Sequence, residues 1–152
     1  MIALPIPWKK SKGSTLSFAS TLYLYPILDL LLIHIPSQWK AEIRLGLQEA
    51  LVNAARHGNK LDPNKTIVVE FNVTSTEYWW IIKDEGTGFV PQCPCHSDIE
   101  QPLHLPAVEA ESGRGLCILH EVFDLVHWNR DGTQVTLAKQ LKNSDRNQPM
   151  IL

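Results

Sequence analysis

Asp84-Glu85-Gly86-Thr87-Gly88-Phe89 is the stretch that decides the fold of this chain. It follows a run from Glu77 that is rich in aromatic and β-branched residues, which predicts a strand. A carboxylate at the end of a strand can accept a charge-assisted, directional hydrogen bond. The two glycines allow positive φ angles and a close approach of backbone to a ligand. An aspartate here could equally satisfy its own turn backbone, so the neighbouring segments have to distinguish the two interpretations.

A second segment, Glu49-Ala-Leu-Val-Asn53-Ala-Ala-Arg-His57-Gly58, precedes it. We predict a helix from about residue 38 to about residue 56, capped by Ser37 and ended by Gly58. Glu49 and Asn53 then lie one turn apart on one face. A different face carries an apolar stripe that repeats every four residues, made of Trp39, Ile43 and Leu47.

The side chains of this pair suit chemistry on phosphates. The amide oxygen of Asn53 can bind Mg²⁺, an ion that prefers oxygen ligands, and an asparagine in mid-helix is otherwise mildly unfavourable. Glu49 is placed to take a proton from an attacking hydroxyl or water. Alternatively, both are simply polar residues on a solvated helix face. His57 at the helix end has a favourable structural role.

The third segment is Gly113-Arg114-Gly115-Leu116. We predict a helix over residues 116–123, so that the two glycines directly precede its first turn. A helix N-terminus presents unpaired N–H groups and partial positive charge, which suits phosphates. Arg114 could add a cationic contact, and the alternative is a flexible loop end.

The remaining patterns predict an α+β fold. A strand is expected at 15–19, a helix at 22–35, strands at 66–73 and 77–84, a loop at 90–112 and strands at 124–128 and 133–141. Residues 129–132 form a turn between the last two strands. The predicted architecture is a two-layer sandwich: a mostly antiparallel sheet of the four strands after residue 65, with helices on one face.

The composition indicates a soluble globular domain. The chain has 152 residues, 44% hydrophobic and 20% charged, with a net charge of −2. The sequence has no long basic run, which argues against direct nucleic-acid binding. No segment reads as a signal peptide or as a membrane span of roughly 20 apolar residues. Three cysteines make no even disulfide framework, so we expect a reduced, cytoplasmic protein with Cys117 in the core. Cys93-Pro94-Cys95-His96 offers only three ligands, one short of a structural zinc site.

Taken in order, the three segments and Asp131-Gly132-Thr133 resemble the ATP-binding (Bergerat) fold of the GHKL superfamily of gyrase, Hsp90, histidine kinases and MutL. Within it they look closest to the branch of anti-sigma factors and switch-protein serine kinases. The resemblance covers residues 14–141, between a lead-in at 1–13 and a polar tail at 142–152. It implies an ATP lid at about 89–112.

The resemblance also implies a role for each matching residue. Asp84 would bind the adenine amino group, Asn53 would hold Mg²⁺ between the phosphates, and Glu49 would be the general base. The other residues implied to bind the nucleotide are Gly86 and Gly88 in the pocket wall, Gly113, Arg114, Gly115 and Leu116 at the phosphate end of the lid, and Thr133 on the strand beneath the adenine.

Members of this branch sequester a sigma factor, phosphorylate a serine of a STAS-type anti-anti-sigma protein, and are generally dimers. We therefore expect an ATP-dependent serine/threonine protein kinase that acts as an anti-sigma factor. One alternative is a non-catalytic binding protein in which nucleotide only shapes the partner surface. A histidine kinase catalytic domain fits less well, because no upstream dimerisation helix with a phospho-acceptor histidine is evident.

Overall fold

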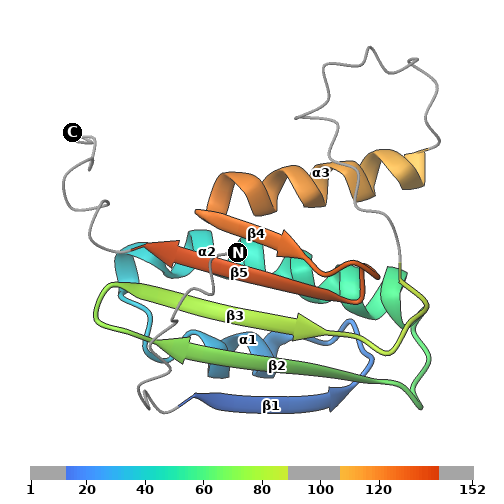
Figure 1. Ribbon diagram of the computed structural model, residues 1–152, viewed down its shortest axis with the longest axis horizontal. Coiled ribbons are helices and arrows are strands. Elements are labelled where there is room, and N and C mark those ends of the chain that lie inside the picture. Colours follow the sequence, from blue (N-terminus) through green and yellow to red (C-terminus); the bar gives the residue numbers. More distant parts are fainter. Residues whose placement is uncertain (1–12, 89–106, 141–152) are drawn as a thin grey trace.

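The computed structural model describes residues 13–88 and 107–140, with side chains omitted for 107–114. Five strands form one antiparallel sheet in the order β1-β2-β3-β5-β4, and the helices cover one of its faces (Figure 1). This confirms the predicted α+β sandwich. The strands are β1 (Ser14–Ala19), β2 (Thr66–Val73), β3 (Glu77–Lys83), β4 (Leu125–Trp128) and β5 (Gln134–Gln140), and the helices are α1 (Tyr25–Leu31), α2 (Ser37–Val52), η1 (Asn53–Gly58) and α3 (Ala107–Val122).

The sheet follows the period-2 alternation of its strands. Ile67 and Val69 of β2 and Trp80 and Ile82 of β3 point into the core and are almost fully buried. The sheet has one strand more than predicted, because β1 pairs with β2 along its whole length. Strand β1 lies at the edge of the sheet and has no buried residue, whereas β2 and β3 bury alternate side chains, so its sequence pattern is weaker.

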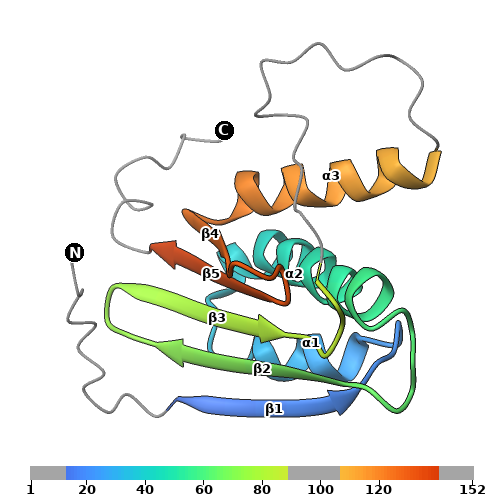
Figure 2. The ribbon, with the colours of Figure 1, turned by 45° about the vertical axis from the view of Figure 1, so that its right-hand side comes forward.

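Helix α2 is the centre of the helical layer, and α3 packs beside it on the same face of the sheet (Figure 2). Ile43 and Leu47 of the predicted apolar stripe are fully buried, and Trp39 is partly buried against the core. Gly46 allows α3 to come close, since a Cβ there would lie 2.6 Å from the Phe123 ring. The close contact of α2 and α3 brings two of the predicted site segments to one place.

Several helix boundaries differ from the predictions. Helix α1 is shorter than residues 22–35, with Pro26 in its first turn as expected. Ser37 is the first helical residue rather than a cap, and no side chain caps α2. Helix α3 begins at Ala107, so the predicted loop at 90–112 was wrong for 107–112. Residues 89–106, the rest of the predicted lid, lie outside the described residues.

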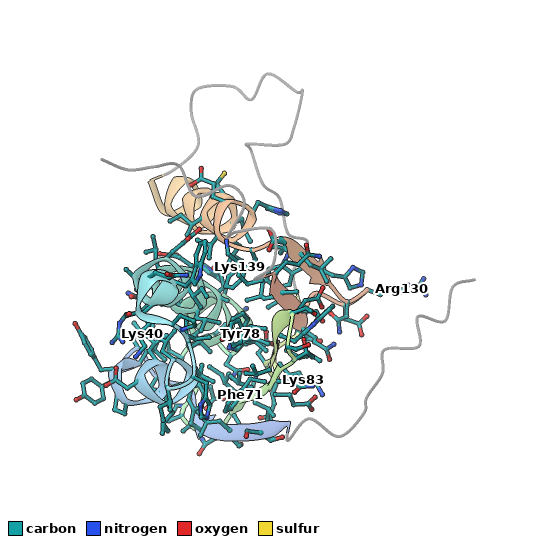
Figure 3. All side chains as sticks on the ribbon, turned by 90° about the vertical axis from the view of Figure 1, so that its left-hand side faces the viewer. Lys40, Phe71, Tyr78, Lys83, Arg130 and Lys139 are labelled. Atoms are coloured by element: carbon teal, nitrogen blue, oxygen red, sulfur yellow. The ribbon has the colours of Figure 1, made fainter. Side chains whose placement is uncertain are left out.

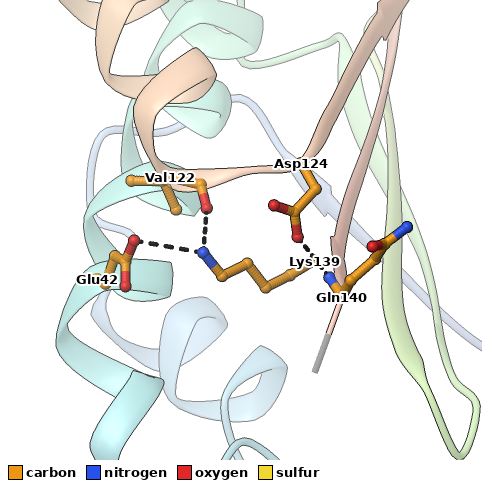
Figure 4. A network of polar contacts seen from close by, with 5 residues as sticks. All are labelled: Glu42, Val122, Asp124, Lys139 and Gln140. Carbon is orange, nitrogen blue, oxygen red and sulfur yellow. Dashed lines mark hydrogen bonds and ion pairs between the residues drawn. The ribbon is translucent and has the colours of Figure 1, made fainter. Parts of the chain in front are cut away.

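Lys139 ties β5 to both long helices. Its side chain lies between the sheet and the helical layer, whereas Lys83 lies on the opposite face with Glu70 (Figure 3). Lys139 Nζ donates a hydrogen bond of 2.7 Å to the carbonyl oxygen of Val122, and it lies 3.4 Å from Glu42 Oε1 (Figure 4). A cation at the last carbonyls of a helix is favourable, so Lys139 fixes the end of α3 against α2.

Cys117 differs from its prediction. It is half-buried on α3 rather than in the core, and it is disulfide-bonded. The expectation that all three cysteines are reduced was therefore wrong for Cys117. Within the described ranges, no helix has both the length and the apolar character needed to cross a membrane.

Candidate nucleotide site

Asn53 lies where α2 changes to the π-helix η1. Single-turn π segments are rare and occur often at functional sites. The Asn53 side chain is buried, and its Nδ2 has no hydrogen-bond partner among the described residues. Leaving a buried amide without a partner costs about 1–3 kcal/mol. A ligand that bonded to this amide would remove the cost, and the burial argues against the interpretation of Asn53 as a solvated polar residue.

Glu49 lies one turn before Asn53 and faces α3. A Cβ on Gly115 would lie 2.7 Å from Glu49 Oε2, so the glycine is what allows the carboxylate to fit there. Burial raises the pKa of Glu49 above that of an ordinary glutamate. A raised pKa makes a carboxylate a stronger base, which suits proton abstraction.

Gly58 and Gly86 bring the end of η1 against Asp84. A Cβ on Gly58 would overlap the Asp84 carboxylate, and a Cβ on Gly86 would overlap the carbonyl of Gly58. Neither glycine has a positive φ angle, so that expectation was wrong for Gly86, and Gly58 ends the helical segment without a left-handed conformation. The left-handed residues that end this helix are instead Lys60 and Leu61, with φ of 53° and 57°.

Asp84 makes the hydrogen bond of a turn aspartate and leaves its role toward a ligand open as a prediction. Its Oδ1 accepts the Gly86 N–H at 2.8 Å, as a turn aspartate does. Because a carboxylate has two oxygens with several lone pairs, this bond leaves acceptor capacity for a ligand. Burial raises the pKa of Asp84, opposed by the Gly86 N–H and the charge of Lys65.

Thr133 lies beside Asp84. Its carbonyl accepts the Asp84 N–H at 2.9 Å, although β5 itself begins one residue later. The predicted turn at 129–132 is confirmed: the Gly132 N–H donates to the Asn129 carbonyl, and Gly132 has a φ of 74°. Gly88, with a φ of 87°, packs against the carbonyl of Asp131.

The Gly113–Leu116 segment lies inside α3 and not before it. The free N–H groups of a helix are those of its first four residues, so a helix beginning at Ala107 leaves none at Gly113 or Gly115. The prediction of a phosphate-binding N-terminus at this segment was therefore wrong. Leu116 is buried in the core, and the Arg114 side chain is outside the described part.

Two further residues belong to this region. Burial, and then the charge of Arg56, lower the pKa of His57 and so favour its neutral form, while its structural role at the helix end stays a prediction. Asn59 was missed, although it is fully buried beside the Asp84 turn. It lies in a polar run that reads as a loop, and nothing in that run distinguishes a buried asparagine from an exposed one. No group of three metal-binding side chains occurs among the described residues, and Cys93, Cys95 and His96 lie outside them.

The comparisons with known proteins agree with this geometry. The histidine kinase-like ATPase domain matches residues 30–139, so the chain belongs to that family. It is similar to the anti-sigma F factor of Shouchella clausii (strain KSM-K16), with 33% identity over 107 residues, or 66% of this chain and 68% of that protein.

A second anti-sigma F factor, from Halalkalibacterium halodurans, is 32% identical over 110 residues, or 68% of this chain and 70% of that protein. The serine-protein kinase RsbW of Bacillus subtilis (strain 168) is 28% identical over 115 residues, or 69% of this chain and 66% of that protein. These names confirm the resemblance to the anti-sigma factor and serine kinase branch.

Proposed function

We propose that this protein is an ATP-dependent serine/threonine protein kinase that acts as an anti-sigma factor. The observation that carries this proposal is that one helical segment, η1, begins with a buried asparagine and ends against the half-buried Asp84 carboxylate. Asn53, with its unpartnered amide, begins η1, and Gly58 at its end packs against the Asp84 carboxylate. The names of the similar proteins support the biological role.

Adenine would bind through its exocyclic amino group to Asp84. The amino group is a donor, and a carboxylate is a strong, directional acceptor. The bonds of Asp84 to Thr133 and Gly86 fix this acceptor before the base arrives. Gly86 and Gly88 would line the pocket. Of the segment Gly113, Arg114, Gly115 and Leu116, only Arg114 remains a proposed phosphate contact, because the two glycines lie inside α3 and Leu116 is buried.

The residues fit a magnesium ion. Asn53 would hold Mg²⁺ through its amide oxygen, with water and phosphate oxygens completing the shell. The unpartnered Nδ2 could then donate to a phosphate oxygen, which would satisfy the whole amide. The bound ion would neutralise charge on the transferring phosphoryl group.

Glu49 would act as the general base. Its carboxylate takes the proton of a serine hydroxyl on the protein substrate, and the hydroxyl oxygen then attacks the γ-phosphorus in line with the departing ADP. The raised pKa of Glu49 supports this assignment. The absence of a Cβ on Gly115 of α3 leaves the space in which this carboxylate lies.

The partners follow the same proposal. The protein would sequester a sigma factor and phosphorylate a STAS-type anti-anti-sigma protein, as a homodimer in the cytoplasm. It would have no direct contact with nucleic acid. The two interaction partners are inferred from the names of the similar proteins, one described as an anti-sigma factor and one as a serine-protein kinase.

Calorimetric titration with ATP and Mg²⁺ tests the pocket. We expect saturable binding by the wild type, binding at least about tenfold weaker in Asp84→Asn, and binding in Asn53→Ala that no longer responds to Mg²⁺. A folded wild type that binds no ATP would overturn the proposal.

Phosphotransfer from labelled ATP to a STAS protein tests the chemistry. Glu49→Gln should keep ATP affinity and lose transfer by about 10²–10⁴-fold, the usual contribution of a general base. ATP binding without any transfer by the wild type would favour the non-catalytic regulator instead.

A further inference from the structure

Asn59 is a polar side chain with no exposed surface. Burying an amide is costly unless its groups are hydrogen-bonded. Here both ends are satisfied: Nδ2 donates to Ser20 Oγ at 2.7 Å and to the Thr66 carbonyl at 3.1 Å, while Oδ1 accepts the Glu85 N–H at 2.7 Å. One side chain therefore joins the end of β1, the start of β2 and the turn after β3.

The bond to Glu85 acts directly on Asp84. The Glu85 nitrogen belongs to the peptide unit that follows Asp84, and that unit is planar and rigid. On the other side of Asp84, its own N–H is held by the Thr133 carbonyl. The backbone of Asp84 is thus fixed at both of its peptide units, by Asn59 on one side and Thr133 on the other.

The position of Asn59 is itself strongly constrained. Its N–H donates to the Ala54 carbonyl at 2.8 Å, and the Leu61 N–H donates to the Ala55 carbonyl at 2.8 Å. Lys60 and Leu61, which follow, are both in the left-handed region. Such residues are strained and persist where their surroundings impose the conformation, often at functional sites.

A second bond between the same segments supports this arrangement. Glu85 Oε2 accepts the Thr66 N–H at 3.0 Å, so β2 holds the turn through a side chain as well. The exposed Glu85 carboxylate is a weaker constraint than the buried amide of Asn59, because water competes for it. Asn59 is therefore the main link between the turn and the rest of the fold.

We propose that Asn59 is a positioning residue that aims the Asp84 carboxylate and so sets the preference of the pocket for adenine over guanine. This inference rests on the proposed function, in which Asp84 accepts the adenine amino group. Guanine presents a carbonyl where adenine has that amino group, and a fixed carboxylate repels it. A carboxylate free to turn away discriminates less, since selectivity depends partly on the cost of the wrong contact.

The test measures the ratio of ATP to GTP affinity by calorimetry. In Asn59→Ala the Glu85 N–H loses its acceptor. We expect the ratio of ATP to GTP affinity to fall about tenfold or more, which is the effect of losing one hydrogen bond to a charged group, here the bond of adenine to Asp84. Asn59→Asp keeps an oxygen for that N–H and should recover most of the ratio, although a buried carboxylate makes the protein less stable. If the role of Asn59 were purely structural, the ratio of ATP to GTP affinity would fall in both variants in proportion to their loss of melting temperature.

Two further variants secure the interpretation. If Asn59→Ala does not fold, Asn59→Ser takes its place. The serine hydroxyl stops one bond short of the Glu85 N–H, so the ratio of ATP to GTP affinity should fall as in Asn59→Ala. Lys139→Met removes another buried polar side chain in a different part of the fold and should keep the ratio. An unchanged ratio in Asn59→Ala or Asn59→Ser, or a reduced one in Lys139→Met, would overturn the inference.

The wild type and Asp84→Asn separate this inference from the function on which it rests. A wild type that prefers ATP and loses the preference in Asp84→Asn supports the proposed pocket. If the Asn59 variants then keep the preference, only the role of Asn59 is wrong. If the wild type binds both nucleotides equally or neither, the proposed pocket and the role of Asn59 are overturned together.

Discussion

Gly58 lies against the Asp84 carboxylate so closely that a Cβ on the glycine would overlap it. The two residues are 26 positions apart in the sequence, one at the end of η1 and one after β3. The contact joins the helical segment that begins with Asn53 to the proposed adenine acceptor. The absence of a side chain at residue 58 is thus a condition for the position of Asp84.

Gly58→Ala should therefore move Asp84. We expect ATP affinity to fall by about tenfold or more, and the free energy of unfolding to fall by about 1–3 kcal/mol from overpacking. Calorimetry and thermal melts measure the two effects. Gly13→Ala is the matched control, because a Cβ there would lie 4.0 Å from the nearest atom, the Phe71 carbonyl oxygen. A folded Gly58→Ala with normal ATP affinity would contradict the proposed link.

Asp84→Asn should change the dependence of stability on pH. Burial raises the pKa of Asp84 in the folded state above its unfolded value, so the folded protein binds more protons between the two values. Stability from this group is then full below the unfolded pKa and is lost as the pH rises through the folded pKa.

Asparagine does not ionise and avoids this loss. We expect Asp84→Asn to melt above the wild type at neutral pH, with the difference shrinking as the pH falls below the raised pKa. Melting both proteins without nucleotide over a pH series checks this. A variant that is less stable at neutral pH would mean that the charged Asp84 stabilises the fold.

Gly115→Ala should reduce phosphotransfer more than binding. Its Cβ would lie 2.7 Å from Glu49 Oε2 and would displace the proposed base. Displacements of about 1 Å can cost up to about 10²-fold in rate. We expect kcat to fall by up to about 10²-fold, with little change in ATP affinity.

Gly46→Ala is the control for Gly115→Ala. It also crowds the contact of α2 with α3, but against Phe123 and Val122 of the core. It should lower the melting temperature and leave kcat of the folded protein unchanged. Equal losses of kcat in both variants would show that helix packing, and not the position of Glu49, controls the rate.

Lys139→Met should destabilise the protein without affecting nucleotide binding. The change leaves the Val122 carbonyl and Glu42 without their cation, while the methionine fills the space of the lysine stem. We expect a loss of about 1–3 kcal/mol in the free energy of unfolding, measured by urea denaturation. No loss of stability would indicate that water replaces the lysine at the end of α3.

The local patterns determined much of this protein. Alternation predicted β2 and β3, the four-residue repeat predicted the buried stripe of α2, and the spacing of Glu49 and Asn53 placed them on one helix face. These features depend on neighbours within a few residues, which share a face through strand or helix geometry. The glycine segments pointed to the family for the same reason, since their spacing is local.

Only the tertiary structure decided how these segments meet. Gly58 and Gly86 are glycines because distant backbone and a carboxylate lie against them, a contact that no local pattern contains. Helix α3 begins at Ala107, packs beside α2 and continues through Gly113 and Gly115, where the sequence indicated a break. Asn59 is buried because β1, β2 and the Asp84 turn converge on it, and such convergence is a property of the folded chain alone.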